Sequence, residues 1–519
     1  MKLMHRVFLT FGVLFVLWTS ANEETALAIQ TNAYPTKLAA VLPWNEGNPV
    51  INGPDILGAS PGKPFLYLIP TVGERPIAFG AKNLPRGLSV DAKKGQIVGK
   101  ARKAGEYAVV LMAENRLGAC KKTIRIVIGE NALALTPPMG WCSWNCFRSN
   151  ITDTKIRAIA QSLVDSGLAA RGYIYVNLDS GWQSSKRGGP FNSIVPKNEF
   201  PDMKALCSFI HTLGLKAGIY SGPYVIPWGT EGEGCGTTSG QLDTTFDFHQ
   251  RWPAGKYIGV VKHEHEDVSQ WADWGFDYFK YDWSTTDMTL TERMSKALRA
   301  SSRDIVFSVT TGVALKDASR VKELANLWRS NGDTNPSWGS VRERFDNQKP
   351  WNTAIGPGHW FDLDMTALMP EKDKCLSANE RIACISCWMM RPSPIFIDYD
   401  PVKLDDFLIN LLCNEEIIAI NQDRLGLPAV SILRTDVWDV QLKPLSDGSY
   451  ALALFNLGTR PGVSPKVDLA FLKLGGVFKM RDVWAKEDLG EFKNPFEVGV
   501  DDHCAKVFKL VAPNNTNQN

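Results

Sequence analysis

The segment FDYFKYDW, residues 276–283, decides the fold of this chain. Its aromatic residues favour a buried β-strand, and the strand ends in a cation and a carboxylate two residues apart. Because side chains alternate faces along a strand, Lys280 and Asp282 point the same way. In a (β/α)8 barrel, the chemistry sits at the carboxyl ends of the strands. We therefore predict a barrel strand that delivers Lys280 and Asp282 to the active end.

Seven further segments show a similar pattern, and helical stretches such as 153–166 and 290–301 lie between most of them. Eight alternations of strand and helix over residues 131–425 predict a (β/α)8 barrel. A doubly wound open sheet is the alternative, but no glycine-rich phosphate loop follows the first strand. The eight predicted strand ends are 139–144, 173–182, 215–221, 276–283, 304–311, 327–333, 359–365 and 394–398.

Two β-rich regions flank the predicted barrel. Residues 45–130 contain short β-type runs separated by Gly and Pro clusters, which predicts a β-sandwich. Residues 426–519 contain the alternating runs 437–442 and 450–455, joined by a turn. We therefore predict an antiparallel β domain at the C-terminal end.

The first 28 residues have the layout of a signal peptide, with basic residues, an apolar run at 7–18 and then small and polar residues. The apolar run is too short for a comfortable transmembrane helix. We therefore predict a protein that is exported, either periplasmic or secreted, and not inserted in a membrane after cleavage. The net charge of +2 gives no reason to expect nucleic acid as a partner. The sequence leaves the oligomeric state open.

The ten cysteines are too sparse for a disulfide scaffold. Cys384 and Cys387 lie in an apolar run, where they are either core residues or a local disulfide. No second Cys pair or His cluster completes a zinc site. We predict neither a metal nor a cofactor.

A second strand end carries a carboxylate with a cation nearby. The run 327–333 contains Arg329 and ends at Asp333. Two carboxylates at separate strand ends predict glycoside hydrolysis, with one acting as the nucleophile and the other as the proton donor. Taken singly, Asp282 could be an ion-pair partner of Lys280, and Asp333 a turn or helix-cap residue.

Two other classes of function compete with a glycosidase. A non-catalytic carbohydrate-binding barrel would be marked by loss of one of the two carboxylates, and both are present. A metal-dependent hydrolase needs converging His ligands, but His263 and His265 fall in a polar loop and His359 is isolated.

Five motifs together resemble glycoside hydrolase family 27, which contains α-galactosidases and α-N-acetylgalactosaminidases. The motifs are PPMGWCSWN at 137–145, KYD at 280–282, RSNGD at 329–333 with Trp338, GPGHWFDLDM at 356–365, and INQD at 420–423 with Leu425 and Gly426. They keep the family order over about residues 134–427. The stretch 84–99 also resembles the immunoglobulin-like modules that are attached to exported glycosidases.

The resemblance implies a retaining enzyme that removes terminal α-D-galactosyl residues from oligo- or polysaccharides. Asp282 matches the nucleophile, and the charge of Lys280 beside it favours the ionised carboxylate. Asp333 matches the acid/base, which needs a raised pKa to start protonated. The resemblance also implies that Lys280 binds sugar hydroxyls.

Further positions match sugar contacts of the family, although barrel-top packing and ion pairing would also explain them. They are Trp144, Asp179, Tyr220, Arg329 and Asp364.

The chain departs from the family pattern at several places. Ser180 stands where most α-galactosidases carry a second Asp, and Thr310 stands where a Glu or Ser reads the 2-substituent of the sugar. Trp283 and Ser284 replace a Cys that usually forms a disulfide. An extra stretch, about 236–262, predicts a long loop over the active-site face. The sugar therefore stays open among galactose, β-L-arabinopyranose, N-acetylgalactosamine and glucose.

Overall fold

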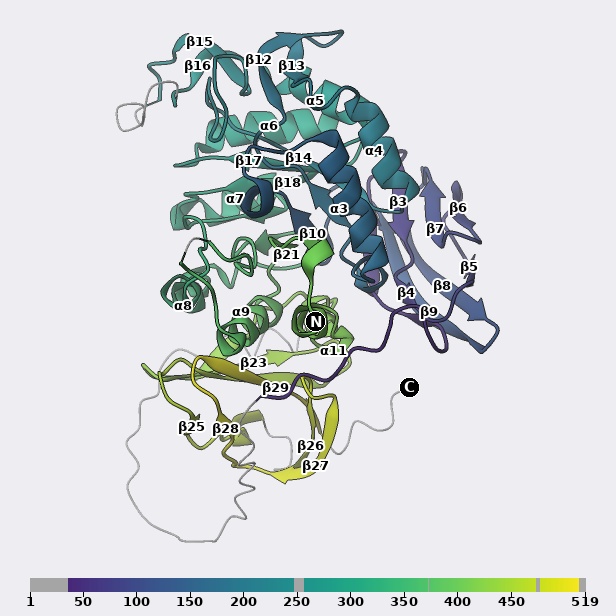
Figure 1. Ribbon diagram of the computed structural model, residues 1–519, viewed down its shortest axis with the longest axis vertical. Coiled ribbons are helices and arrows are strands. Elements are labelled where there is room, and N and C mark those ends of the chain that lie inside the picture. Colours follow the sequence, from purple (N-terminus) through teal and green to yellow (C-terminus); the bar gives the residue numbers. More distant parts are fainter. Residues whose placement is uncertain (1–35, 247–255, 372, 473–476, 513–519) are drawn as a thin grey trace.

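The computed structural model describes residues 36–246, 256–371, 373–472 and 477–512 (Figure 1). The predicted signal peptide, residues 1–28, lies outside the described residues. An N-terminal β region, a barrel and a C-terminal sheet follow one another along the chain. None of the described helices is both long enough and apolar enough to cross a membrane.

The barrel is an eight-stranded parallel sheet in the order β20-β19-β18-β17-β14-β11-β10-β21. All eight predicted strands are confirmed. β10 pairs with both β11 and β21, so the first and last strands lie side by side. The strands are β10 (Met139–Cys142), β11 (Tyr175–Asn177), β14 (Lys216–Ser221), β17 (Tyr278–Asp282), β18 (Val306–Thr310), β19 (Leu327–Trp328), β20 (Trp360–Phe361) and β21 (Ile395–Ile397).

Helices cover the outer face of this sheet (Figure 1). The predicted helices at 153–166 and 290–301 are confirmed as α3 and α6. Their first turns are capped by polar side chains, as when the Asp287 carboxylate accepts a hydrogen bond from the amide of Leu290. The helices are α3 (Asp153–Asp165), α4 (Met203–Thr212), α5 (Glu264–Trp274), α6 (Met288–Ala300), α7 (Ala318–Leu324), α8 (Trp338–Asn347), α9 (Ala378–Met390), α10 (Asp406–Leu412) and α11 (Glu415–Asn421).

Strand β17 shows why the barrel forms around this segment. Phe279 and Tyr281 are fully buried, and the ring of Phe279 stacks on that of Phe307 at 5.9 Å between centroids. Strands that are covered on both faces have near-continuous apolar runs, as this one does. Lys280 and Asp282 alternate with these rings, so both polar side chains face the inside of the barrel at its carboxyl end.

The N-terminal β region has a core of its own. A four-stranded sheet, β2-β9-β8-β5, and a three-stranded sheet, β3-β7-β6, contribute buried side chains to it, which confirms a β-sandwich. Its likeness to an immunoglobulin-like module and the limits of the three predicted domains stay predictions. The strands are β1 (Val50–Ile51), β2 (Ile56–Ala59), β3 (Phe65–Leu68), β4 (Thr71–Val72), β5 (Ala78–Lys82), β6 (Leu88–Asp91), β7 (Gln96–Gly99), β8 (Gly105–Asn115) and β9 (Gly118–Ile128).

The C-terminal sheet shares one continuous core with the barrel. The predicted antiparallel domain is confirmed as the sheet β22-β23-β24-β29-β26-β27. Trp484 is fully buried, and its indole Nε1 donates to the Ser386 hydroxyl of α9 at 3.0 Å. The strands are β22 (Val430–Arg434), β23 (Trp438–Pro444), β24 (Tyr450–Asn456), β25 (Gly462–Val463), β26 (Val477–Asp482), β27 (Glu487–Lys493), β28 (Gly499–Val500) and β29 (Cys504–Val511).

An N-terminal strap, residues 36–44, runs from the C-terminal sheet toward the N-terminal β region. The amide of Thr36 donates to the Asp501 carboxylate at 2.9 Å, and the amide of Ala39 donates to the carbonyl of Trp484 at 2.8 Å. The strap therefore places the first described residues beside the start of β29.

The extra stretch before α5 contains an antiparallel hairpin of β15 (Thr238–Leu242) and β16 (Gly259–Lys262). The predicted long loop is therefore partly ordered as strands, and residues 247–255 lie outside the described part. The thiols of all ten cysteines are free, so Cys384 and Cys387 are core residues of α9.

Candidate active site

Asp282, at the end of β17, is held by hydroxyl groups from the two neighbouring strands. Tyr220 on β14 donates to Oδ2 at 2.9 Å, and Thr310 on β18 donates to Oδ1 at 3.0 Å. Burial raises the pKa of Asp282 to about 6, and the positive charge of Lys280 limits that rise. A half-buried carboxylate with both oxygens bound is a candidate nucleophile with a fixed orientation.

Lys280 pairs with Asp179 rather than with Asp282. Its Nζ donates to Asp179 Oδ2 at 2.7 Å. Burial alone would lower the pKa of Lys280, but the carboxylates of Asp179 and Asp282 raise it well above the ordinary value. The thiol of Cys142 lies 3.4 Å from the same oxygen of Asp179. Lys280 is therefore a permanent cation between two carboxylates.

Ser180 is engaged by the protein itself. Its hydroxyl donates to the carbonyl of Trp228 at 2.7 Å, and the Tyr220 hydroxyl lies 3.2 Å from that carbonyl. The next residue, Gly229, has φ +70°, and a Cβ there would come within 2.9 Å of the Ser180 hydroxyl and 2.8 Å of the Trp144 ring. The turn at 228–229 therefore packs directly on Ser180 and Trp144.

Lys256 holds the same turn from outside. Its Nζ donates to the carbonyl of Ile226 at 2.8 Å and lies 4.8 Å from the centroid of the Trp228 ring. We did not predict roles for Trp228 and Lys256, because they fall in the region before and within the extra stretch, where no family motif marks them. The turn and its Lys form one wall of the candidate site.

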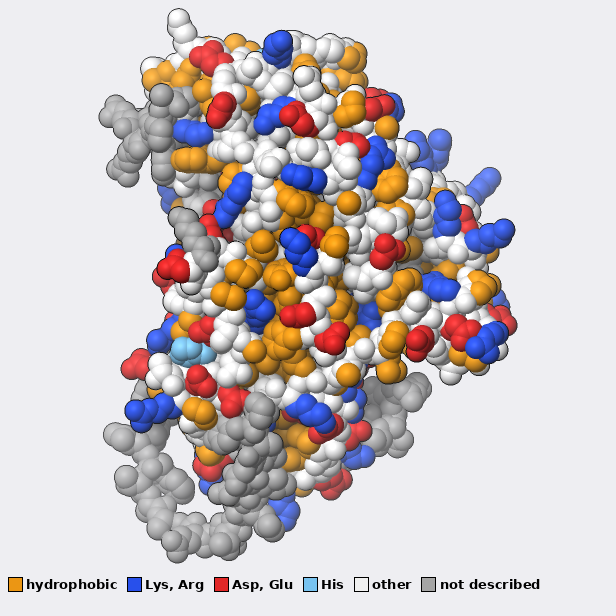
Figure 2. All heavy atoms as spheres, in the orientation of Figure 1, with side chains coloured by type: hydrophobic (Ala, Val, Ile, Leu, Met, Phe, Trp, Pro, Cys, Tyr) orange, Lys and Arg blue, Asp and Glu red, His pale blue; other side chains and the backbone are white. Residues whose placement is uncertain are grey.

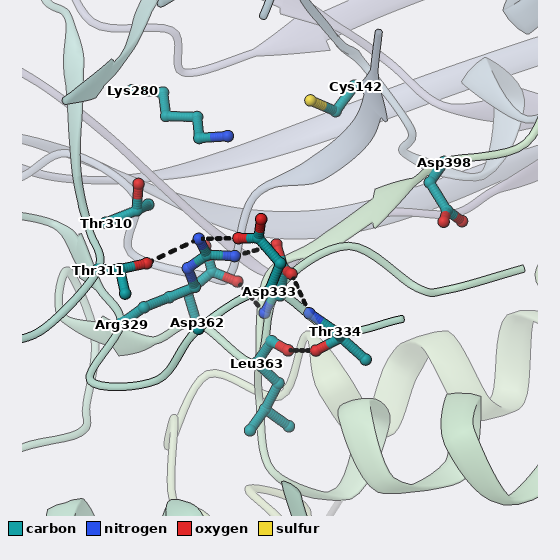
Figure 3. Close-up of polar contacts among 12 residues, drawn as sticks. Cys142, Lys280, Thr310, Thr311, Arg329, Asp333, Thr334, Asp362, Leu363 and Asp398 are labelled. Carbon is teal, nitrogen blue, oxygen red and sulfur yellow. Dashed lines mark hydrogen bonds and ion pairs between the residues drawn. The ribbon is translucent and has the colours of Figure 1, made fainter. Parts of the chain in front are cut away.

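Arg329, just after β19, organises the second half of the site. One guanidinium nitrogen, Nη2, donates to Asp333 Oδ1 at 2.8 Å and to the Thr311 hydroxyl at 2.9 Å (Figure 3). The other, Nη1, forms an ion pair with Asp364. Arg329 is buried, whereas the side chain of Asp333 is 75% exposed. The acid/base candidate is therefore tethered by one ion pair and open to solvent.

The expected raised pKa of Asp333 is wrong for this structure. The charge of Arg329 stabilises the ionised form and holds the pKa of Asp333 below its ordinary value. Of the two carboxyls, Asp282 is therefore the one that holds a proton more readily here.

Asp364 is fixed by its backbone and its neighbours. It has φ +82°, an unusual value for a residue other than Gly. Its Oδ2 accepts from the amide of Thr334 at 2.6 Å, and its own amide donates to Asp362 Oδ1 at 2.8 Å. Burial raises the pKa of Asp362 to about 6. Asp362 is a neighbour that sequence reasoning missed, although it precedes Asp364 by two residues in the same motif.

A cavity of about 20 Å³, large enough for one water, is lined by residues of both halves, among them Asp179, Lys280 and Arg329. Five of its lining residues are labelled in Figure 3: Cys142, Lys280, Thr310, Arg329 and Asp362. The structure brings all ten predicted site residues to this end of the barrel: Trp144, Asp179, Ser180, Tyr220, Lys280, Asp282, Thr310, Arg329, Asp333 and Asp364.

The chain is similar in sequence and fold to known proteins. The model of the family described as alpha galactosidase A matches residues 136–235 and 236–423, and that of the alpha galactosidase C-terminal beta sandwich domain matches 435–510. The chain belongs to the α-galactosidase family, glycoside hydrolase family 27. Alpha-galactosidase 2 of Arabidopsis thaliana is 31% identical over 390 residues, which cover 73% of this chain and 91% of that protein.

Two further proteins are similar to this chain over most of their length. The alpha-galactosidase of Coffea arabica is 34% identical over 386 residues, 73% of this chain and 95% of that protein. A solved structure of a candidate alpha-galactosidase/melibiase from Bacteroides fragilis is 31% identical with a TM-score of 0.80. That comparison covers 90% of this chain and 99% of the other. As a member of this family, the chain is a glycosidase with a carbohydrate substrate.

Proposed function

We propose that this protein is an exported, retaining glycosidase that removes terminal α-D-galactosyl residues from oligo- or polysaccharides. The observation that carries the proposal is the pair Asp282 and Asp333 near one end of the barrel, in opposite settings. One carboxyl is half-buried and oriented by two hydroxyls, and the other is exposed beside Arg329. The names of the relatives in Arabidopsis thaliana and Coffea arabica support galactose as the sugar.

In the proposed mechanism, Asp282 attacks the anomeric carbon while Asp333 gives a proton to the leaving oxygen. The result is a glycosyl ester on Asp282. Asp333, now ionised, takes a proton from water. The water oxygen bonds to the anomeric carbon on the face opposite Asp282, and the bond from that carbon to Asp282 breaks and releases the carboxylate. Two inversions at the anomeric carbon retain its configuration.

Substrate binding has to favour a proton on Asp333. The pKa of Asp282 is raised to about 6 by burial and that of Asp333 is lowered by the charge of Arg329, but attack requires an ionised Asp282 and a protonated Asp333. A bound sugar removes water from the exposed Asp333, which raises its pKa. Positive charge that develops at the anomeric carbon favours the Asp282 carboxylate. Binding and proton placement are therefore coupled in this proposal.

Nitrophenol release from aryl glycosides tests the proposal. Wild type should cleave the α-galactoside in preference to the α-N-acetylgalactosaminide, β-L-arabinopyranoside and α-glucoside. Asp282→Ala should lose about 10⁴-fold or more in kcat, because no covalent ester can form. Azide should restore part of the rate and yield the inverted glycosyl azide. A folded Asp282→Ala protein with wild-type activity would refute Asp282 as the nucleophile.

The second candidate is the same mechanism on another sugar. Ser180 is neutral and offers no charged acceptor to a galactose hydroxyl, and its own proton is donated to the Trp228 carbonyl. Preferred cleavage of the β-L-arabinopyranoside, the α-N-acetylgalactosaminide or the α-glucoside would replace galactose in the proposal. No cleavage of any of them by folded protein would favour a barrel that binds carbohydrate without catalysis.

Export has a separate test. Expression with the native first 28 residues should place the protein in the periplasm or the medium. Sequencing of its N-terminus should show that it starts after Ala21, Ala26 or Ala28. An intact Met1 on cytoplasmic protein would contradict export and leave the catalytic proposal untouched.

A further inference from the structure

We infer that Thr310 is a positioning residue: its hydroxyl fixes the Asp282 carboxylate and favours its ionised form, so Thr310 acts through the nucleophile rather than by reading the 2-substituent of the sugar. This inference rests on the proposed function, because it needs Asp282 as the nucleophile.

The contact is built into the register of the barrel sheet. Strands β17 and β18 are paired so that Asp282 lies opposite Thr310, and Thr310 Oγ1 donates to Asp282 Oδ1 at 3.0 Å. Thr310 is only 3% exposed, so the bond is shielded from water. The amide of Trp283 also donates to the carbonyl of Thr310, which ties the two strand ends together.

The two oxygens of Asp282 receive different donors. Tyr220 on β14 reaches Oδ2, and Thr310 on β18 reaches Oδ1. A carboxylate held from both sides cannot rotate about its last bond without losing one of these contacts. The Tyr220 proton has a second acceptor in the Trp228 carbonyl, whereas the Thr310 hydroxyl donates, among the residues that the structure describes, to Asp282 alone. Of the two donors, Thr310 therefore has no competing acceptor in the described residues, whereas Tyr220 has one.

The cations around Asp282 are bound to other partners. Lys280 donates to Asp179, Arg329 donates to Asp333, and Lys256 donates to backbone carbonyls. They act on Asp282 through space, as do the charged or titratable groups Asp179, Asp333 and Tyr224. Within the described part of the chain, hydroxyls provide the direct hydrogen bonds to Asp282. Hydroxyl donors stabilise a carboxylate over its neutral acid.

Thr311 provides a matched control. It is the next residue and the same amino acid, but its hydroxyl accepts a hydrogen bond from Arg329 Nη2 at 2.9 Å (Figure 3). It therefore serves the half of the site that holds Asp333. A Thr→Val change at 310 removes a bond to the nucleophile, and the same change at 311 does not.

The test isolates the ionisation of Asp282. In an Asp333→Asn background, a 2,4-dinitrophenyl glycoside of the sugar that wild type cleaves needs no proton on its leaving group. The burst of dinitrophenol then reports attack by Asp282, and its pH dependence gives the pKa of that carboxyl. We expect Thr310→Val to shift the acid limb up by about one pH unit, the loss of one hydrogen bond to a charged group.

Two further variants complete the test. Thr310→Ser keeps the hydroxyl and should keep the limb where it is in the parent, and Thr311→Val should also leave it in place. An unshifted limb in folded Thr310→Val protein would overturn the inference, as would equal shifts in Thr310→Val and Thr311→Val. If Thr310→Val does not fold, Thr310→Ala takes its place. An acid limb at the same pH in Thr310→Ala and Thr310→Ser would then overturn the inference. No burst in the Asp333→Asn background itself would overturn the proposed function and the inference with it.

Discussion

The two β regions that flank the barrel have similar secondary structure but different relations to it. The C-terminal sheet, β22 to β29, shares its core with the barrel, and Lys443 of β23 donates to the carbonyl of Ile420 in α11. The N-terminal β region, β1 to β9, closes a core of its own. Which β region forms one unit with the barrel therefore depends on whether their hydrophobic cores are continuous, not on β content.

Polar contacts join the N-terminal β region to the barrel. The amide of Ser60 donates to the Asp304 carboxylate at 2.7 Å, and the Gln96 side chain donates to the carbonyl of Thr212 at 3.0 Å. Residues 45–129 hold thirteen Lys and Arg against six Asp and Glu. Lys and Arg side chains project into solvent where Figure 1 places β5, β6 and β7 (Figure 2). The N-terminal β region is therefore joined to the barrel without sharing its core, and its exposed surface is rich in Lys and Arg.

The largest effect should follow removal of the C-terminal sheet. A chain that ends at residue 425 exposes the apolar face of α9 and loses the hydrogen bond from Trp484 to Ser386. We expect no soluble, folded barrel and no activity, measured by circular dichroism and nitrophenol release. A folded, active chain of this length would show that the barrel does not need the C-terminal sheet to complete its core.

A single core residue should show the same contrast on a smaller scale. Trp484→Ala should lower the free energy of unfolding of the barrel by about 3–5 kcal/mol, because it empties a fully buried site. Its control is Leu111→Ala, which empties a fully buried site in the N-terminal core. Leu111→Ala should leave the temperature of inactivation unchanged. Equal loss of activity on heating in both variants would mean that the two cores unfold together.

Lys443 should give the junction between barrel and C-terminal sheet a pH dependence. Burial lowers its pKa to about 7 in the folded protein. Between pH 7 and about 10.5 the unfolded chain binds a proton that the folded one does not, so this residue makes stability rise with pH across that window. Lys443→Met should stabilise the protein by about 2 kcal/mol at pH 7. The gain should fade toward pH 10.5 in denaturant titrations, and a gain that does not change with pH would contradict the assignment.

The smallest effect should follow removal of the N-terminal β region. A chain that begins at residue 130 keeps the barrel and the C-terminal sheet. We expect kcat/KM within about threefold of wild type and a melting temperature lowered by a few degrees. The family models match residues between 136 and 510, and the relative in Coffea arabica is covered over 95% of its length by 73% of this chain. Loss of folding would show that the polar contacts at Asp304 and Thr212 are essential.

Local sequence patterns predicted the strands and helices. How these elements pack together depends on contacts between residues far apart in the sequence. The alternation of Phe279, Lys280, Tyr281 and Asp282 is enough to predict a buried strand with two inward polar groups. The same reasoning placed all eight barrel strands, because parallel strands are apolar throughout. It could not predict that the C-terminal sheet joins the core of the barrel, since the partner of Trp484 lies 98 residues away at Ser386.

The site shows the same division. Family motifs predicted Asp282, Asp333 and the residues around them, but not the direction of the Thr310 hydroxyl or the pKa order of the two carboxyls. Both depend on which side chains meet across strands. Arg329, four residues before Asp333, was visible in the sequence, yet its hold on that carboxylate follows from the folded loop.

The position of the N-terminal strap also shows how this chain could be circularly permuted. Thr36 lies beside Ala505 at the start of β29, and its hydroxyl donates to that carbonyl at 3.3 Å. The last described residues lie one strand length away, roughly 25 Å at 3.3 Å per residue. A flexible linker of about ten residues could therefore join the two ends. A circular permutant opened near residue 130 would begin with the barrel and end with the N-terminal sandwich, and would carry that sandwich as a C-terminal fusion.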